Sequence, residues 1–260
     1  MFHTIYNNLI NFFTSFLGAI TFYTIIPLPN QWTKSFQSIA RWSPIIGLGI
    51  GGLLSIIDRL LNLIGFPITV SSALIISLGI YITGGLHLDG VLDSADGLAV
   101  TDPEKRIEVM SDSVTGAFGV MAGIIVILLK IVALSAIVDH RAWVFMMVAG
   151  WGRWGQVSAI AFYPYLKPTG KGAFHKQYLK VPQDLLGGLV SLWGMTGVFI
   201  AFNPELWQLG LRVTGMGMAI ALGVGAWFNR RFGGHTGDTY GAVVEWTETF
   251  IFCLLSIHRP

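Results

Sequence analysis

Eight long apolar runs constrain the fold of this chain more than any other feature. They fall at about 9–26, 43–64, 68–84, 116–138, 142–163, 186–202, 206–228 and 243–257. A helix that crosses a bilayer needs about 20 apolar residues, since each residue adds about 1.5 Å along the axis. Most of the runs approach that length, and 12% of the residues are charged, against about 25% in soluble domains. We predict an all-α, polytopic membrane protein with about seven to eight membrane segments, forming a single integral domain over 1–260.

The connections between the runs alternate in length, and this alternation predicts the topology. Tight turns occur around 65–67, 139–141 and 203–205. Longer connections, which carry many of the Lys and Arg residues, cover about 27–42, 85–115, 164–185 and 229–242. Because cytoplasmic connections carry an excess of Lys and Arg, we expect the long ones, with any active-site loops, on the cytoplasmic side of the cell membrane.

An acidic stretch, T-G-G-L-H-L-D-G-V-L-D-S-A-D-G over 83–97, interrupts this apolar pattern. If it is helical, the spacing of Asp89, Asp93 and Asp96 places all three on one face, with His87 just ahead. Two like charges about 5 Å apart repel by roughly 3 kcal/mol at the reduced dielectric near a membrane. A divalent cation is the simplest counter-charge. Asp112 adds a fourth carboxylate, and Mg²⁺ suits oxygen ligands combined with substrate phosphates.

A glycine-rich block, F-G-G-H-T-G-D-T-Y-G-A-V-V-E-W-T-E over 232–248, is the second candidate site. It supplies donors and acceptors from His235, Thr236 and Asp238, followed by Glu245. Such a loop opening a helix can cradle phosphate. Acids near a helix start also complement the helix dipole without any ligand. The acidic stretch expected on the same side of the membrane favours a functional site over that alternative.

Basic residues provide possible partners for an anionic substrate. The connection 163–180 contains Lys171, which could bind phosphate or serve as a positive-inside anchor. Arg153 lies within an apolar run, where an arginine usually has an acidic or phosphate partner. The candidate substrate-binding residues are Arg106, Arg153, Lys171, His235, Thr236, Asp238 and Glu245.

Several catalytic classes lack their motifs in this sequence. It contains no Walker A motif, no G-x-S-x-G and no His/Cys cluster with zinc spacing. Carboxylates beside basic residues instead favour metal-assisted transfer of a phosphorus-bearing group. We expect a lipid bilayer and small substrates as partners, and no nucleic acid.

Three segments, G-G-L-H-L-D-G-V-L-D-S-A-D-G, R-I-E-V-M-S-D-S-V-T-G-A-F-G and G-G-H-T-G-D-T-Y-G-A, resemble the cobalamin synthase family. The resemblance covers nearly the whole chain in order. It implies a multi-pass inner-membrane transferase that needs Mg²⁺ and completes the nucleotide loop of cobalamin. Its substrates would be adenosylcobinamide-GDP and α-ribazole or α-ribazole 5′-phosphate, with GMP as the leaving group.

Joined to the residue patterns, the resemblance suggests roles for individual side chains. The metal ligands would be Asp89 and Asp93, then Asp96 and Asp112. The catalytic residues would be His87, Asp89, Asp93 and Asp96, and Asp96 could accept the proton of the attacking hydroxyl. His87, Arg106, Arg153 and His235 would neutralise phosphate oxygens.

Other membrane proteins also use aspartate-rich motifs. A CDP-alcohol phosphotransferase should show D-x-x-D-G-x-x-A-R, and a prenyltransferase should show two aspartate-rich blocks; neither pattern is met. A cation-coupled transporter would place its acids near the bilayer midplane in discontinuous helices. The sequence leaves open a homo-oligomer, association with other corrinoid-assembly enzymes, the preferred lower base and the phosphorylation state of the acceptor.

Overall fold

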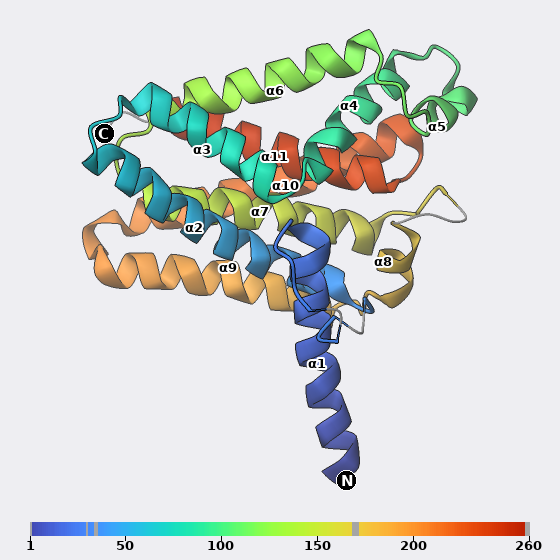
Figure 1. The fold of residues 1–260 in the computed structure, drawn as a ribbon, viewed down its shortest axis with the longest axis horizontal. Helices are drawn as coiled ribbons and strands as arrows, with labels where there is room; N and C mark the ends of the chain where they lie inside the picture. The colour runs from blue at the N-terminus through green and yellow to red at the C-terminus, as the bar shows by residue number, and fades with distance from the viewer. Residues whose placement is uncertain (1, 30, 34–35, 168–171, 258–260) are drawn as a thin grey trace.

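The computed structural model describes residues 2–29, 31–33, 36–167 and 172–257, and these residues are mostly helical (Figure 1). Within them, the pairing of Tyr165 with His235 is an isolated bridge and no strand forms. The all-α prediction is therefore confirmed. The α-helices are α1 (Phe2–Tyr23), α2 (Ser43–Leu63), α3 (Ile68–Ile82), α4 (Leu86–Ala99), α5 (Arg106–Val109), α6 (Ala117–Ala136), α7 (Arg141–Phe162), α8 (Ala173–Tyr178), α9 (Gln183–Phe202), α10 (Trp207–Phe232) and α11 (Gly237–Ile257).

Five helices in the described part of the chain are long and apolar enough to cross a membrane: α2, α6, α9, α10 and α11. Helices α3 and α4 pass the same test together, but their axes are bent by 90°, so the number rises to six if the pair is one span. The sequence predicted about seven to eight segments. Helix α7 accounts for part of the difference, because its Arg153, Gln156 and Ser158 lower its apolar character while neighbouring helices bury them.

Helix α7 lies at the centre of the bundle and packs against α2, α9, α10 and α11. Its contact with α2 is especially close at Gly47 and Gly51. A Cβ atom at either glycine would overlap the α7 backbone, at the carbonyl of Ala149 or of Phe145. Small residues let membrane helices approach each other in this way.

The connections separate to the two ends of the bundle. In Figure 1, α5, α8 and the turn between α10 and α11 lie at the right-hand end, and the tight turns lie at the left. At the left-hand end the guanidinium of Arg141 donates to Asp58 Oδ1 at 2.7 Å and to Asp58 Oδ2 at 2.8 Å. The structure therefore gathers the predicted site segments at one end of the molecule.

Candidate active site

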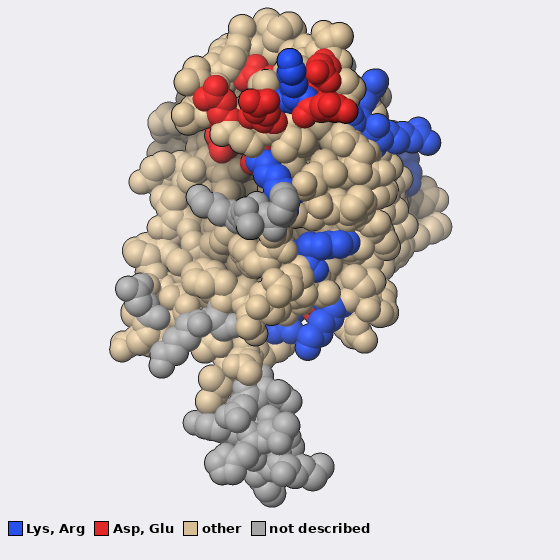
Figure 2. Space-filling view, turned by 90° about the vertical axis from the view of Figure 1, so that its right-hand side faces the viewer, with Lys and Arg blue, Asp and Glu red and all other residues tan. Residues whose placement is uncertain are grey.

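A sharp bend between α3 and α4 presents the acidic stretch. Gly84 and Gly85 adopt φ values of 60° and 72°, a left-handed conformation that glycine adopts at little cost. With 14 residues, α4 is itself too short to span a bilayer. Figure 2 shows acidic side chains gathered in the upper part of the end face, with Lys and Arg side chains beside and below them.

The predicted acidic face forms as expected on α4. Asp89 is exposed, whereas Asp93 and Asp96 are half-buried. Burial, followed by the negative charges of Asp89 and Asp238, raises the pKa of Asp93 to about 7. A carboxyl group in such a position is stabilised in its ionised form by a nearby cation. The site thus has the electrostatic character expected of a cation-binding face.

Asp238 joins this face because α4 and α11 approach closely. A Cβ atom at Gly90 on α4 would overlap the carbonyl oxygen of Asp238. A Cβ atom at Gly241 on α11 would lie 3.1 Å from the Cα and O atoms of His87. These two glycines bring the start of α11 against the acidic helix, in agreement with the expectation that the two blocks lie on the same side.

Lys167 supplies a positive charge at the same place. Its Nζ atom lies 3.1 Å from Asp238 Oδ2, and both side chains remain partly exposed. The preceding segment is tethered to the glycine-rich block, since Leu166 N donates to His235 O at 2.8 Å and His235 N to Pro164 O at 2.9 Å. The sequence analysis chose Lys171 from this connection, and Lys171 lies outside the described residues. Lys167 was missed because a charge in a basic loop gives no sign of its partner.

His235 and Thr236 organise the glycine-rich block from inside. His235 is fully buried, and its Nε2 lies 3.2 Å from Gly225 O. Because a carbonyl oxygen can only accept, Nε2 carries the hydrogen of the neutral ring. Nδ1 then accepts from Thr239 Oγ1 at 3.1 Å. Burial lowers the pKa of His235 to about 4, which leaves the ring neutral at pH 7. Thr236 Oγ1 accepts from Thr239 N at 3.2 Å, as a helix N-cap does. Substrate binding by His235 would require the ring to leave these partners.

Asp96, Asp112 and Arg106 have local partners. Asp96 accepts from Gly116 N at 2.7 Å and from Gly119 N at 2.8 Å, and so caps the start of α6. Asp112 is exposed and accepts from Val114 N at 3.1 Å. Arg106 donates to Arg231 O at 2.8 Å and to Val100 O at 3.3 Å. Asp96 and Asp112 thus already accept backbone hydrogen bonds, and Arg106 lies at the end of α10.

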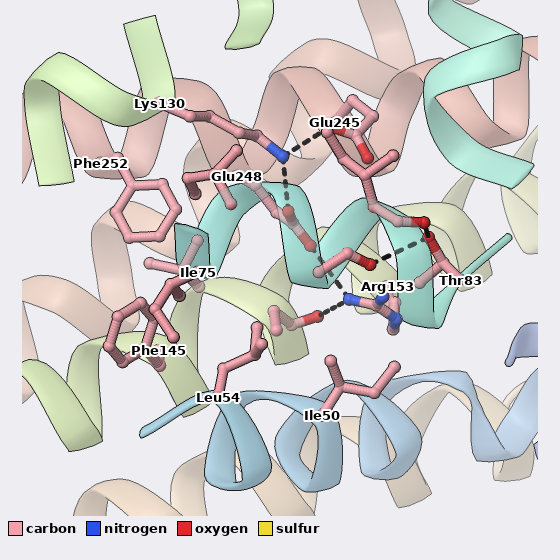
Figure 3. Close-up of a pocket in the computed structure, with 15 residues that line it drawn as sticks. Ile50, Leu54, Ile75, Thr83, Lys130, Phe145, Arg153, Glu245, Glu248 and Phe252 are labelled. Atoms are coloured by element: carbon pink, nitrogen blue, oxygen red, sulfur yellow. Dashed lines mark hydrogen bonds and ion pairs between the residues drawn. The ribbon is translucent and has the colours of Figure 1, made fainter. Parts of the chain in front are cut away.

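Arg153 and Glu245 belong to a buried charge network rather than to the acidic face (Figure 3). Lys130 Nζ on α6 lies 2.5 Å from Glu245 Oε2 and 2.7 Å from Glu248 Oε2, both on α11. Arg153 on α7 donates to Glu248 Oε1 at 3.0 Å. The four side chains line a cavity of about 50 Å³. The sequence predicted an acidic or phosphate partner for Arg153, and within the described residues the partner is the carboxylate of Glu248.

His87 lies beneath the acidic face instead of on it. Its side chain is 1% exposed, and its ring centroid is 6.4 Å from that of Tyr23 on α1. Among the described residues, its Nε2 has no hydrogen-bond partner. A catalytic role for His87 would therefore require access through the packed interior.

The donor set at the acidic face fits a hard cation that the substrate helps to hold. Within the described ranges, no group of three His, Cys, Asp or Glu residues could hold a metal ion by itself. Asp89, Asp93 and Asp238 nevertheless interact electrostatically and offer carboxylate oxygens. Mg²⁺ usually keeps several waters and takes one or two carboxylates together with substrate phosphates, so this incomplete set of carboxylates fits Mg²⁺.

Fold and site together define a polytopic helical membrane protein with an acidic, lysine-bearing face at one end. A family model described as cobalamin-5-phosphate synthase matches residues 15–256. The chain belongs to this family.

Curated relatives support the same family. One from Trichormus variabilis is 53% identical over 93% of this chain and 96% of its own length. One from Synechocystis sp. is 51% identical over 92% of this chain and 93% of its own, and one from Prochlorococcus marinus strain MIT 9313 is 37% identical over 94% and 95%. All three are named adenosylcobinamide-GDP ribazoletransferase. No solved structure matches the chain significantly.

Proposed function

We propose that this protein joins adenosylcobinamide-GDP to α-ribazole, or to α-ribazole 5′-phosphate, and releases GMP. The family supports the reaction, and one structural observation carries its location: Asp93 on α4 is influenced by both Asp89 and Asp238, and Asp238 pairs with Lys167. Two helices and a basic connection thus meet at one face. A cation and a positively charged side chain together would neutralise a diphosphate; this face offers carboxylates to hold the cation and Lys167 as the side chain.

Asp89 and Asp93 are the residues proposed to hold Mg²⁺, with Asp238 nearby on α11. When bound, the ion would neutralise charge on the diphosphate. Asp96 and Asp112 are less suitable, because backbone N–H groups already occupy both oxygens of Asp96 and one of Asp112.

The protein residues orient the reactants for displacement at phosphorus. An acceptor hydroxyl oxygen forms a bond to the cobinamide-side phosphorus, and the bond from that phosphorus to the oxygen of GMP breaks. The hydroxyl proton passes to a carboxylate of the acidic face or to water, and GMP leaves with the bridging oxygen. Lys167 would neutralise a diphosphate oxygen, and such positioning and neutralisation supply most of the catalysis in phosphoryl transfer.

The acidic face is proposed to lie on the cytoplasmic side of the inner membrane. The long connections with Lys and Arg gather at this end of the bundle, in agreement with the positive-inside rule. Both substrates would then approach from the cytoplasm. Assembly as a homo-oligomer, or with other corrinoid-assembly enzymes, is a further proposal that the single chain leaves open.

The test incubates the detergent-purified protein with adenosylcobinamide-GDP, in the presence and absence of α-ribazole, and measures the released GMP by chromatography. We expect GMP and the cobalamin product in equal amounts, and neither without Mg²⁺. GMP release at a rate that does not depend on α-ribazole would contradict the proposal, as would turnover of CDP-alcohol or prenyl diphosphate substrates instead.

A further inference from the structure

An apolar cleft lies behind the acidic helix, on the side of α4 away from the aspartates. It measures about 500 Å³, within the roughly 300–1,000 Å³ of typical ligand sites. Helices α4, α6, α10 and α11 contribute to its wall, and four aromatic side chains dominate it: Trp227, Phe228, Trp246 and Phe250. The proposed reaction uses none of these four residues.

The cleft opens on the apolar outer surface of the bundle. Three of its four helices, α6, α10 and α11, are candidate spans. Trp227 is 44% exposed and Phe250 is 42% exposed. At Gly223 on α10, a Cβ atom would meet nothing within 4 Å. An occupant therefore enters from the hydrocarbon layer of the membrane and is itself apolar where it fills the cleft.

Positive charge gathers at the end of the cleft nearest the acidic face. Arg230 and Arg231 form the last turn of α10 and are both exposed. The guanidinium of Arg231 lies 5.4 Å from the ring centroid of Trp227, which lines the cleft. Arg106 adds a third guanidinium through its bond to Arg231 O. An apolar cleft between spans with arginines at its mouth matches an amphiphile that has an anionic head.

We propose that this cleft binds an acyl chain of an anionic phospholipid, whose phosphate lies against Arg231. Part of the wall comes from α4, through Val91, Ser94, Ala95 and Leu98. The bound acyl chain therefore supports α4, which carries Asp89 and Asp93 on its opposite face. Lipid binding in the cleft does not depend on the proposed reaction. If the protein also catalyses that reaction, anionic lipid should change its turnover.

The binding test uses tryptophan fluorescence, because Trp227 and Trp246 line the cleft. The protein is reconstituted in phosphatidylcholine vesicles that contain a minor fraction of either brominated phosphatidylglycerol or brominated phosphatidylcholine. One arginine attracts anionic lipid by about fivefold, so we expect clearly stronger quenching by the brominated phosphatidylglycerol. Arg231→Gln should remove that difference, and Gly223→Phe, which fills the cleft, should reduce quenching by both lipids.

Gly215→Phe is the matched control, since Gly215 also lies on α10 with nothing within 4 Å of its Cβ position and does not line the cleft. The tryptophan fluorescence of this variant should be quenched as strongly as that of the unmodified protein. Equal quenching by the two brominated lipids would overturn the anionic site. Quenching unaffected by Gly223→Phe would overturn occupation of the cleft, whatever the activity of the protein.

Discussion

The guanidinium of Arg153 on α7 donates to the carboxylate of Glu248 on α11 at 3.0 Å, inside the helix bundle. Lys130 bonds the same carboxylate from α6. Glu245 completes a set of two positive and two negative charges around the small cavity. Because the two positive and two negative charges balance, removing Arg153 leaves two carboxylates with the single positive charge of Lys130, and so a net negative charge inside the bundle.

Arg153→Met should therefore destabilise the protein more than it weakens substrate binding. Breaking one partner of a buried pair costs about 3–5 kcal/mol, which corresponds to a fall in Tm of roughly 10 °C for a chain of this size. Thermal unfolding in detergent measures the loss, and KM of the surviving protein should stay close to its original value. Arg141→Met, which breaks the pair with Asp58 at the opposite end, should cost a similar amount. An unchanged Tm with a raised KM would instead place Arg153 in the substrate site.

Gly90→Leu should inactivate the enzyme by separating α4 from α11. The added side chain meets the backbone of Asp238, so Asp238 moves away from Asp93. A displacement of about 1 Å at a catalytic site can cost about 100-fold in rate, and we expect at least that loss in kcat/KM. Gly187→Leu on α9, where a Cβ meets nothing within 4 Å, is the control. Full activity of Gly90→Leu would show that the contact does not position the site.

The stability of the metal-free protein should depend on the ionisation of Asp93. Its pKa is raised to about 7 in the folded protein, against about 3.9 in an unfolded chain. Between these values the folded state binds more protons, so the free energy of unfolding falls as pH rises from about 4 to about 7. Tm measured with EDTA should fall over this range, and Asp93→Asn should flatten the fall. The exposed Glu104→Gln variant should behave as the unmodified protein does, and parallel curves for all three would contradict the assignment.

Lys167→Met should raise KM for adenosylcobinamide-GDP. A hydrogen bond to a charged group contributes about 1.5–3 kcal/mol, so the increase should be at least tenfold, with a smaller change in KM for α-ribazole. Lys167→Arg should recover part of the affinity. Lys105 is exposed near α5, and Lys105→Met should leave both KM values unchanged. Steady-state kinetics with each substrate varied in turn measure these changes. Equal increases in both KM values would indicate a general disturbance of the connection.

The sequence predicted the helical class and the acidic face because both depend on local periodicity. Apolar run length identifies a span, and the spacing of Asp89, Asp93 and Asp96 identifies a face without any knowledge of neighbouring helices. The glycine-rich block was likewise visible in the sequence, and in the structure its Asp238 lies near enough to Asp93 to raise the pKa of that carboxyl group.

Pairings between distant helices could not be predicted in the same way. Nothing local distinguishes Lys167, which meets Asp238, from the other lysines of its connection. Arg153 was a candidate ligand because a charge in a span is unusual, and Glu245 because it belongs to the glycine-rich block. Sequence could not show that Glu248 pairs with Arg153, or Lys130 with Glu245, inside the bundle. Asp96 shares its face with two candidate ligands, and its bonds to the start of α6 depend on how α4 packs.

The most direct test of the account is the initial rate of GMP release as a function of Mg²⁺ concentration, in the unmodified protein and in Asp89→Asn and Asp93→Asn. The account predicts saturable Mg²⁺ dependence in the unmodified protein. It also predicts a shift to higher Mg²⁺ concentration together with at least a 100-fold loss of rate in both variants, without a loss of Tm. Variants that keep the Mg²⁺ dependence and the rate of the unmodified protein would contradict it.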